Sequence, residues 1–327
     1  MDLPRDLIQV ASARMTGLGD QRRNFSLMTA ARLALMFLVL GCGKREELLG
    51  VIPALVPDSG PDAQGAVRPH FATPELVDTL NVAGADDEAP TLTADLLEIY
   101  FMSARSGTRR LWTSTRASRT EPWQPPHEVS ELRTTSFEIT PSVSLDGLRL
   151  WFCVGSTPTR VWLSIRASRN DPWNAAVLLA DLVPPTGTAQ VNSPTLDESE
   201  TMIAVALRGT ATEGWDLYAA TRTSSDANWG AFAPMPGVGS AVNEYDPSLI
   251  GQGRELFFAS ARSGMDDLFW SQRASDSDVF QAPLALDELN SPDFKDYDPF
   301  IAPDRSVLFF ASNRLGFSDI YQAAASP

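Results

Sequence analysis

The 327-residue sequence predicts an all-β fold: a five-bladed β-propeller whose last blade is closed by an outer strand from the N-terminal side. Three observations predict it. A block of about 52 residues recurs five times, every block contains strand-length apolar runs, and the last block lacks its final run. A fixed period of this size is typical of solenoids, arrays and propellers.

The repeat is marked by a proline that opens each block. The blocks start at Pro90, Pro141, Pro194, Pro247 and Pro299, so the spacings are 51, 53, 53 and 52. Residues that return in every block maintain the repeat. Residues that differ between blocks are therefore the better candidates for function.

Each of the first four blocks contains four strand-like runs separated by turn signals such as Ser106-Gly107. In the first block the runs are expected at residues 90–93, 98–103, 110–115 and 126–132. They favour aromatic and β-branched residues, as in "EIYFMS" and "VLFFAS", and are apolar almost throughout. Such runs suit strands that are covered on both faces. Four strands per unit form one propeller blade.

The two chain ends are expected to close the ring. The last block stops at "DIYQAAASP" without a fourth run, whereas "FATP" from Phe71 matches "FQAP" from Phe280. The segment before the first block would then supply the outer strand of the last blade and hide an otherwise bare sheet edge. Residues 70–327 are thus predicted to form five blades. Trp123, Trp173 and Trp229 align with Phe280 and are expected to pack within the blades.

The N-terminal segment predicts export. Arg22, Arg23 and Arg32 precede or flank an apolar run, Leu33–Leu40, that is too short to span a bilayer. Residues 1–42 therefore match a secretory signal. The string "VLGC" resembles the lipobox of bacterial lipoproteins, which implies lipidation of Cys42. The alternative is a buried apolar stretch with a chance cysteine.

The expected location follows from this signal. Residues 43–69, rich in Pro, Gly, Ala and Asp, would form a flexible tether. The propeller would lie in the periplasm or at the cell surface, held to a bacterial membrane only through its lipid. We expect a monomer.

The net charge and the absence of catalytic motifs from the sequence limit the possible functions. The net charge of −15 argues against nucleic acid, which requires a basic footprint, and fits an acidic surface, a cationic partner or a metal ion. No catalytic motif or His/Cys ligand cluster is present, so no catalytic residue, cofactor or metal site is predicted. Cys153 lies in an apolar run and is expected to be buried. A carboxylate pair for glycoside hydrolysis remains open.

The repeat itself resembles a known family. "PSVSLDGLRLWF" from Pro141 and "SARSGMDDLF" from Ser260 are similar to the WD40-like (PD40) propeller repeat of the TolB type. The resemblance covers residues 70–327 and implies a propeller fold and a habit of binding. The chain departs from TolB itself in lacking the N-terminal domain of that protein and in having five blades instead of six.

Ionisable repeat residues mark a candidate binding rim. In propellers, the loops that lead into each blade and those between its second and third strands share one face. The candidates on this face are Glu88, Arg105, Glu138, Arg208, Tyr245, Asp246, Arg262, Tyr297, Asp298 and Arg314. They form either a mixed-charge rim that grips a peptide or sugar, or ion pairs between adjacent blades that hold the loops.

Two functional hypotheses follow. The first is a non-catalytic, envelope-anchored module that docks a protein or peptide through the channel-mouth face. The alternative is a glycan-binding or glycan-hydrolysing propeller. Carboxylates about 5–10 Å apart on the channel face would favour hydrolysis. A charged rim with no deep cavity would favour docking.

Overall fold

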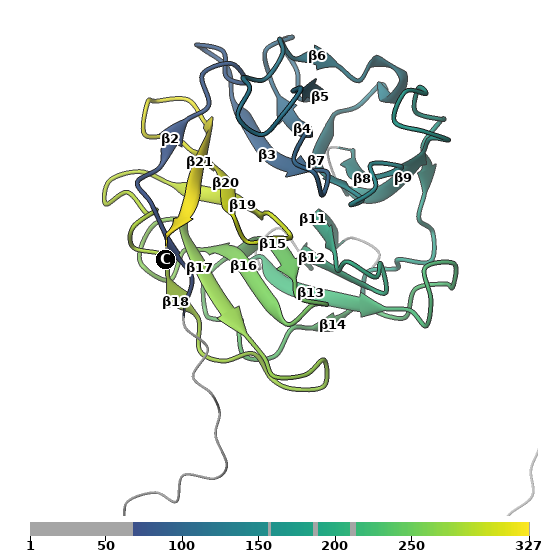
Figure 1. Ribbon diagram of the computed structural model, residues 1–327. Coiled ribbons are helices and arrows are strands. Elements are labelled where there is room, and N and C mark those ends of the chain that lie inside the picture. The colour runs from purple at the N-terminus through teal and green to yellow at the C-terminus, as the bar shows by residue number, and fades with distance from the viewer. Residues whose placement is uncertain (1–67, 156–157, 186–188, 210–213, 327) are drawn as a thin grey trace, which may run out of the picture. The chain divides into compact units, whose positions relative to one another are not determined.

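The computed structural model describes residues 68–155, 158–185, 189–209 and 214–326. This part of the chain forms five small antiparallel sheets arranged as the blades of a propeller (Figure 1). The predicted signal (1–42), Cys42 and nearly all of the predicted tether (43–69) lie outside the described residues. Within the described ranges, no helix is both long and apolar enough to cross a membrane.

In each of the first four blades, the strands follow one another in sequence order from the channel outward. Blade 1 contains β3 (Asp87–Leu92), β4 (Glu98–Ser103), β5 (Arg110–Thr115) and β6 (His127–Glu128), followed by the 3-10 turn η1 (Ser130–Leu132). Blade 2 contains β7 (Glu138–Val143), β8 (Arg149–Val154), β9 (Arg160–Ile165) and β10 (Val177–Leu178). Blade 3 contains β11 (Gln190–Leu196), β12 (Met202–Arg208), β13 (Asp216–Thr221) and β14 (Ala233–Pro234). Blade 4 contains β15 (Glu244–Ile250), β16 (Glu255–Ser260), β17 (Asp267–Gln272) and β18 (Leu284–Ala285).

The second and third runs of the first block match β4 and β5, but its first and last runs differ from the prediction. The innermost strand β3 begins at Asp87, three residues before Pro90. It starts earlier than predicted because the residues before the bulge, Asp87 and Glu88, also pair with β4. The outer strand β6 has only two residues. A short outer strand limits the exposed pairing edge of the blade.

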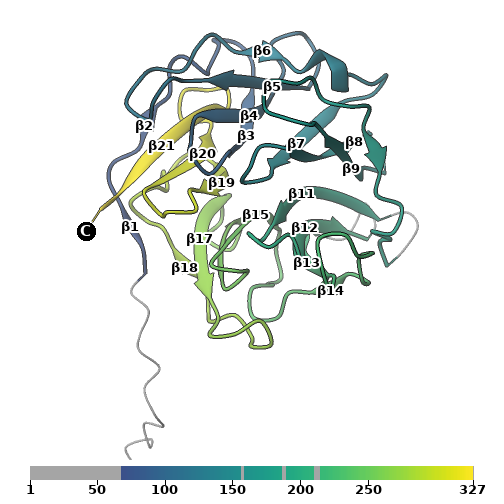
Figure 2. The same ribbon diagram turned by 45° about the vertical axis from the view of Figure 1, so that its right-hand side comes forward.

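Blade 5 is closed as predicted. It contains β19 (Asp296–Ile301), β20 (Val307–Ser312) and β21 (Asp319–Ser326), and the N-terminal strands β1 (His70–Phe71) and β2 (Glu75–Leu76) both pair with β21 (Figure 2). Arg68, just before this segment, forms an ion pair with Glu288 of blade 4, in which the guanidinium lies 2.6 Å from the carboxylate.

The aromatic residue of each outer segment packs inside the blade stack, as predicted. Trp123, Trp173, Trp229, Phe280 and Phe71 are all buried. In blades 1 to 4, an arginine seven residues earlier stacks on this ring: Arg116 on Trp123, Arg166 on Trp173, Arg222 on Trp229 and Arg273 on Phe280, at 4.1–4.8 Å from the ring centroid. The stacking joins the third strand of each blade to its outer segment.

Every innermost strand has a bulge just before its opening proline. Register shifts occur at the same place in all five strands, where the residue preceding the proline has a positive φ. These residues and their φ angles are Ala89 (54°), Thr140 (48°), Ser193 (52°), Asp246 (52°) and Asp298 (53°). A non-glycine residue in this region is strained by about 1–2 kcal/mol. The bulge changes which side chains of the strand face the channel.

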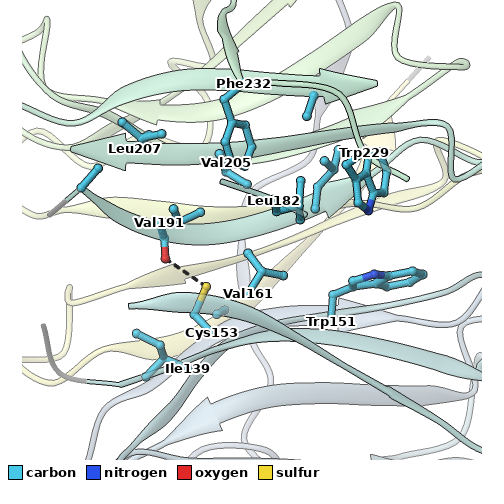
Figure 3. Packing of buried hydrophobic residues seen from close by; sticks show 14 of the residues in the cluster. Ile139, Trp151, Cys153, Val161, Leu182, Val191, Val205, Leu207, Trp229 and Phe232 are labelled. Atoms are coloured by element: carbon cyan, nitrogen blue, oxygen red, sulfur yellow. Dashed lines mark hydrogen bonds between the residues drawn. The ribbon is translucent and has the colours of Figure 1, made fainter. Parts of the chain in front are cut away.

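Cys153 is a core residue, as expected. It is fully buried between blades 2 and 3 beside Ile139, Val161 and Val205, and its thiol donates a hydrogen bond to the Val191 carbonyl at 3.2 Å (Figure 3). Burial raises the pKa of the Cys153 thiol to about 12.

This environment predicts an unreactive thiol. In a Cys42→Ser variant, where Cys153 is the single cysteine, iodoacetamide at about pH 8 should leave the folded protein unmodified, because alkylation requires an accessible thiolate. The same reagent in denaturant should label it stoichiometrically. Mass spectrometry distinguishes the two products, and rapid labelling without denaturant would contradict the buried position.

Candidate functional site

The five bulges form the neck of the central channel. The residue before each opening proline, the proline and the residue after it line a cavity of about 40 Å³. A cavity this small has room for a few water molecules at most. Larger ligands would therefore not pass through the neck.

Two carboxyl groups meet in this neck. Asp246 and Asp298, on the adjacent blades 4 and 5, are hydrogen-bonded to each other. The Ser193 hydroxyl donates to Asp246 Oδ1 at 2.5 Å, and the Ala89 amide donates to Asp298 Oδ2 at 3.0 Å. Two carboxyl groups in contact cannot both ionise readily, so they hold a proton between them.

Burial is the main cause of the raised pKa values of Asp246 and Asp298. It raises the pKa of Asp246 to about 6. The pKa of Asp298 is also raised, by burial first and then by the negative charges of Asp246 and Glu88. The neck therefore retains a proton at a pH where ordinary carboxyl groups are ionised.

Glu88 adds a third carboxylate from blade 1. Tyr297 Oη donates to its Oε1 at 2.7 Å and also contacts the Ser318 hydroxyl. Burial raises the pKa of Glu88, and burial together with Glu88 raises the pKa of Tyr297, which thus remains a hydrogen-bond donor. Blades 2 and 3 contribute the hydroxyl residues Thr140 and Ser193 at the matching positions, so the negative charge is one-sided.

Three of the predicted rim arginines are engaged in pairs with buried carboxylates. Each reaches from the loop between the second and third strands to the first residue of the innermost strand of the same blade. The pairs are Arg105–Asp87 (2.6 Å), Arg262–Glu244 (3.2 Å) and Arg314–Asp296 (2.5 Å), and the acidic side chains are 0% exposed. These pairs brace single blades, whereas the sequence suggested pairing between blades.

The other predicted rim residues have individual partners. Glu138 is buried and joins two blades through Arg110, at 2.7 Å. Arg208 donates to Gln190 Oε1 at 3.0 Å and stacks on Trp215. The hydroxyl of Tyr245 lies near Asp266, and burial first, then Asp266, raises its pKa.

The structure thus separates the predicted rim residues other than Tyr245 into two groups. Glu88, Asp246, Tyr297 and Asp298 gather at the neck, while the arginines and Glu138 are committed to pairs. The pairing acids Asp87, Glu244 and Asp296 were not among the site residues predicted from the sequence. Their signal was available, because an acid stands three residues before the opening proline in four of the five blocks.

Exposed apolar side chains lie on the loops of the same face. They are Val82, Val183, Val242, Phe294, Leu315 and Phe317. The last three, which we term the blade-5 apex, are 40%, 65% and 51% exposed. Backbone and side-chain hydrogen bonds between Lys295 and Asn313 join the two loops that carry them.

The blade-5 apex is also connected to the neck. Ser318, next to Phe317, contacts the hydroxyl of Tyr297, and its carbonyl oxygen accepts a hydrogen bond from the Asp87 amide at 2.7 Å. Elsewhere on the described part of the chain, as at the neck, His, Cys, Asp and Glu side chains do not form a group that could hold a metal ion.

Comparisons with solved structures identify similar propellers. The α-L-arabinofuranosidase PaAbf62A from Podospora anserina, solved in complex with cellotriose, is 10% identical with a TM-score of 0.57, covering 79% of this chain and 97% of that one. The family 117 glycoside hydrolase Zg3597 from Zobellia galactanivorans is 10% identical with a TM-score of 0.55, covering 79% and 90%.

A propeller of the TolB type is also similar. TolB from Acinetobacter baumannii is 10% identical with a TM-score of 0.46, and the match covers 76% of this chain and 56% of TolB. No protein-family model matches the sequence, and no curated protein matches it. At these identities the likeness extends to the fold alone.

Proposed function

We propose that this protein is a non-catalytic binding module that docks a protein or peptide through the channel-mouth face. The observation that carries the proposal is the blade-5 apex, where Phe294, Leu315 and Phe317 are exposed on loops hydrogen-bonded to one another. Apolar side chains grouped on a polar surface are typical of sites for macromolecular contact.

Charge defines the partner further. Arg105, Arg262 and Arg314 are already paired with buried acids, so they offer little net positive charge to a ligand. Asp246 and Asp298 line the neck and Glu88 lies near them, so this side of the channel mouth is acidic. A partner segment with apolar side chains and a basic group would complement both features.

Anchoring belongs to the same proposal. A lipid on Cys42, with residues 43–69 as a tether, would hold the propeller at a bacterial membrane, in the periplasm or at the cell surface. The protein would act there as a monomer whose docking face is free to meet an envelope partner.

The docking proposal is tested by capture with surface variants. The full chain, solubilised in mild detergent and tagged at its C-terminus, is incubated with envelope extract at low and high salt. We expect the wild type to capture one protein in stoichiometric amount. The Leu315→Ser/Phe317→Ser variant should not capture it, because the variant removes the apolar contact. Val279→Ser/Leu284→Ser is the matched control, since both residues are exposed outside these loops: Leu284 lies in the outer strand β18 and Val279 in the segment that leads into it.

Two outcomes of this experiment would contradict the docking proposal. Capture of no stoichiometric protein would do so, and so would equal capture by the apex variant and the control. Weakening by salt would indicate that the neck carboxylates contribute to the contact.

Glycan hydrolysis is the second candidate, favoured by the gathering of Glu88, Asp246 and Asp298 at the channel. The direct hydrogen bond between the two aspartates is unfavourable to it, because glycosidase carboxyl groups stand about 5–10 Å apart. Release of reducing ends from a panel of arabinose-containing polysaccharides and cello-oligosaccharides by wild type, and its loss in Glu88→Gln, would establish this function in place of docking.

A further inference from the structure

A second cavity lies where the ring closes. It measures about 290 Å³ and is lined by three parts of the chain: the N-terminal closing segment at Thr73 and Glu75, blade 1 at Leu96 and Arg116, and blade 5 at Val307 and Phe309. The closing strand β2 runs beside β21 at this seam (Figure 2). The cavity is separate from the channel neck and shares no residue with it.

The seam between blades 1 and 2 provides a comparison for this one. Between blades 1 and 2, Arg166 donates to Glu98 at 2.8 Å while the neighbouring Arg169 pairs with Asp95. Glu98 is the eighth residue after its opening proline. The eighth residue after Pro299 in blade 5 is Val307.

The seam therefore has the arginines without one of the carboxylates. Arg116 occupies the place of Arg166, and Arg119 pairs with Asp304 at 2.5 Å as Arg169 pairs with Asp95. Where blade 1 has Glu98, blade 5 has the Val307 side chain; the matching residues of blades 2, 3 and 4 are Arg149, Met202 and Glu255. Among the described residues, no carboxylate lies within ion-pair distance of Arg116.

Arg116 is held in place but not neutralised. Its Nε donates to the Leu96 carbonyl at 2.8 Å, its Nη1 donates to the Arg119 carbonyl at 3.0 Å, and its guanidinium stacks on Trp123. Burial, and then the positive charge of Arg119, lower the pKa of Arg116. A partly buried cation without a counter-ion favours the binding of an anion.

The apolar residues that line the rest of the cavity indicate what kind of anion would fit. Leu96 and Phe309 are essentially fully buried, and with Val307 they give the cavity an apolar wall. Small-molecule sites typically combine such walls with a few fixed polar groups. A carboxylate would match the planar guanidinium, and an apolar body would match the wall.

We propose that the seam cavity binds a small organic anion that carries a single carboxylate on an apolar body, with Arg116 as its counter-ion. This site is independent of the docking function. A ligand there would contact the closing segment, blade 1 and blade 5 together, so binding would stabilise the closed ring.

The experiment uses the full chain in mild detergent and phenylpropionate as the probe. Calorimetry should detect saturable binding of one equivalent, and the melting temperature should rise with probe concentration. Phenylpropionamide, which keeps the apolar body without the charge, and inorganic phosphate, which keeps the charge without the body, should bind at least tenfold more weakly.

Two variants locate the site. Arg116→Gln should weaken phenylpropionate binding at least tenfold, whereas Arg273→Gln, which removes the equivalent stacking on Phe280 in blade 4, should leave it unchanged. Val307→Glu should place a carboxylate where Glu98 stands in blade 1. It should abolish binding while keeping the fold, because the new acid pairs with Arg116.

The proposal is overturned if wild type binds no phenylpropionate, or if the amide or phosphate binds as tightly. Unchanged affinity in Val307→Glu would also overturn it. Since Val307→Glu retains Arg116 and its stacking, this variant decides the matter even where Arg116→Gln is poorly folded.

Discussion

Replacement of Arg314 by alanine is expected to lower the free energy of unfolding by about 3–5 kcal/mol, the usual cost of leaving a buried charge without its partner. Arg314 Nη2 lies 2.5 Å from the carboxylate of Asp296, which is 0% exposed, and also donates to the Leu289 carbonyl. The guanidinium stacks on Tyr321 as well. Urea unfolding measures the change.

Two further variants show whether the buried pair is the cause. Arg119→Ala breaks the exposed pair with Asp304 and should cost only about 0–1 kcal/mol. The double replacement Arg314→Leu/Asp296→Leu should recover much of the stability lost in Arg314→Ala, because it removes both charges. A double variant as unstable as Arg314→Ala would contradict this account.

The channel neck should make the protein less stable as the pH rises. Burial raises the pKa of Asp246 to about 6 and that of Asp298 further above its ordinary value. A carboxyl group whose pKa is higher in the folded state contributes stability that is complete below its unfolded pKa and is lost as the pH rises through the folded pKa. The loss should therefore begin above about pH 4 and extend through about pH 6 and beyond.

Asp298→Asn isolates this effect. The amide keeps the shape of the protonated carboxyl group and its acceptor for the Ala89 amide, but it cannot ionise. We expect the variant to be more stable than wild type by about 1–3 kcal/mol at pH 8, with a smaller difference at pH 5, since one pKa unit corresponds to about 1.4 kcal/mol. Urea unfolding at both pH values measures it.

The control for this prediction is an exposed carboxylate, Glu121→Gln, which should change stability little at either pH. An Asp298→Asn variant with the same difference from wild type at pH 5 and pH 8 would show that the neck does not hold a shared proton. A less stable variant at pH 8 would show that the charge of Asp298 is favourable in the fold.

The candidate site was harder to predict than the fold, for a reason visible at Asp87 and Glu88. Both are acids at the start of a repeat, yet Asp87 is buried against Arg105 while Glu88 reaches Tyr297 near the channel. Alternation along a strand sends neighbours to opposite sides, and the bulge at Ala89 shifts that alternation. Sequence spacing alone did not reveal which acid would face the channel.

What the sequence by itself determined was the five-bladed fold and its closure through β1 and β2, because a repeat records the same backbone requirement five times and its missing strand appears at the other end of the chain. Only the tertiary structure decided which charges are free. The pairing of Arg314 with Asp296, the contact of Asp246 with Asp298 and the unpaired Arg116 beside Val307 depend on side chains from distant blocks. Their protonation and pairing follow from burial and distance, which are properties of the folded ring.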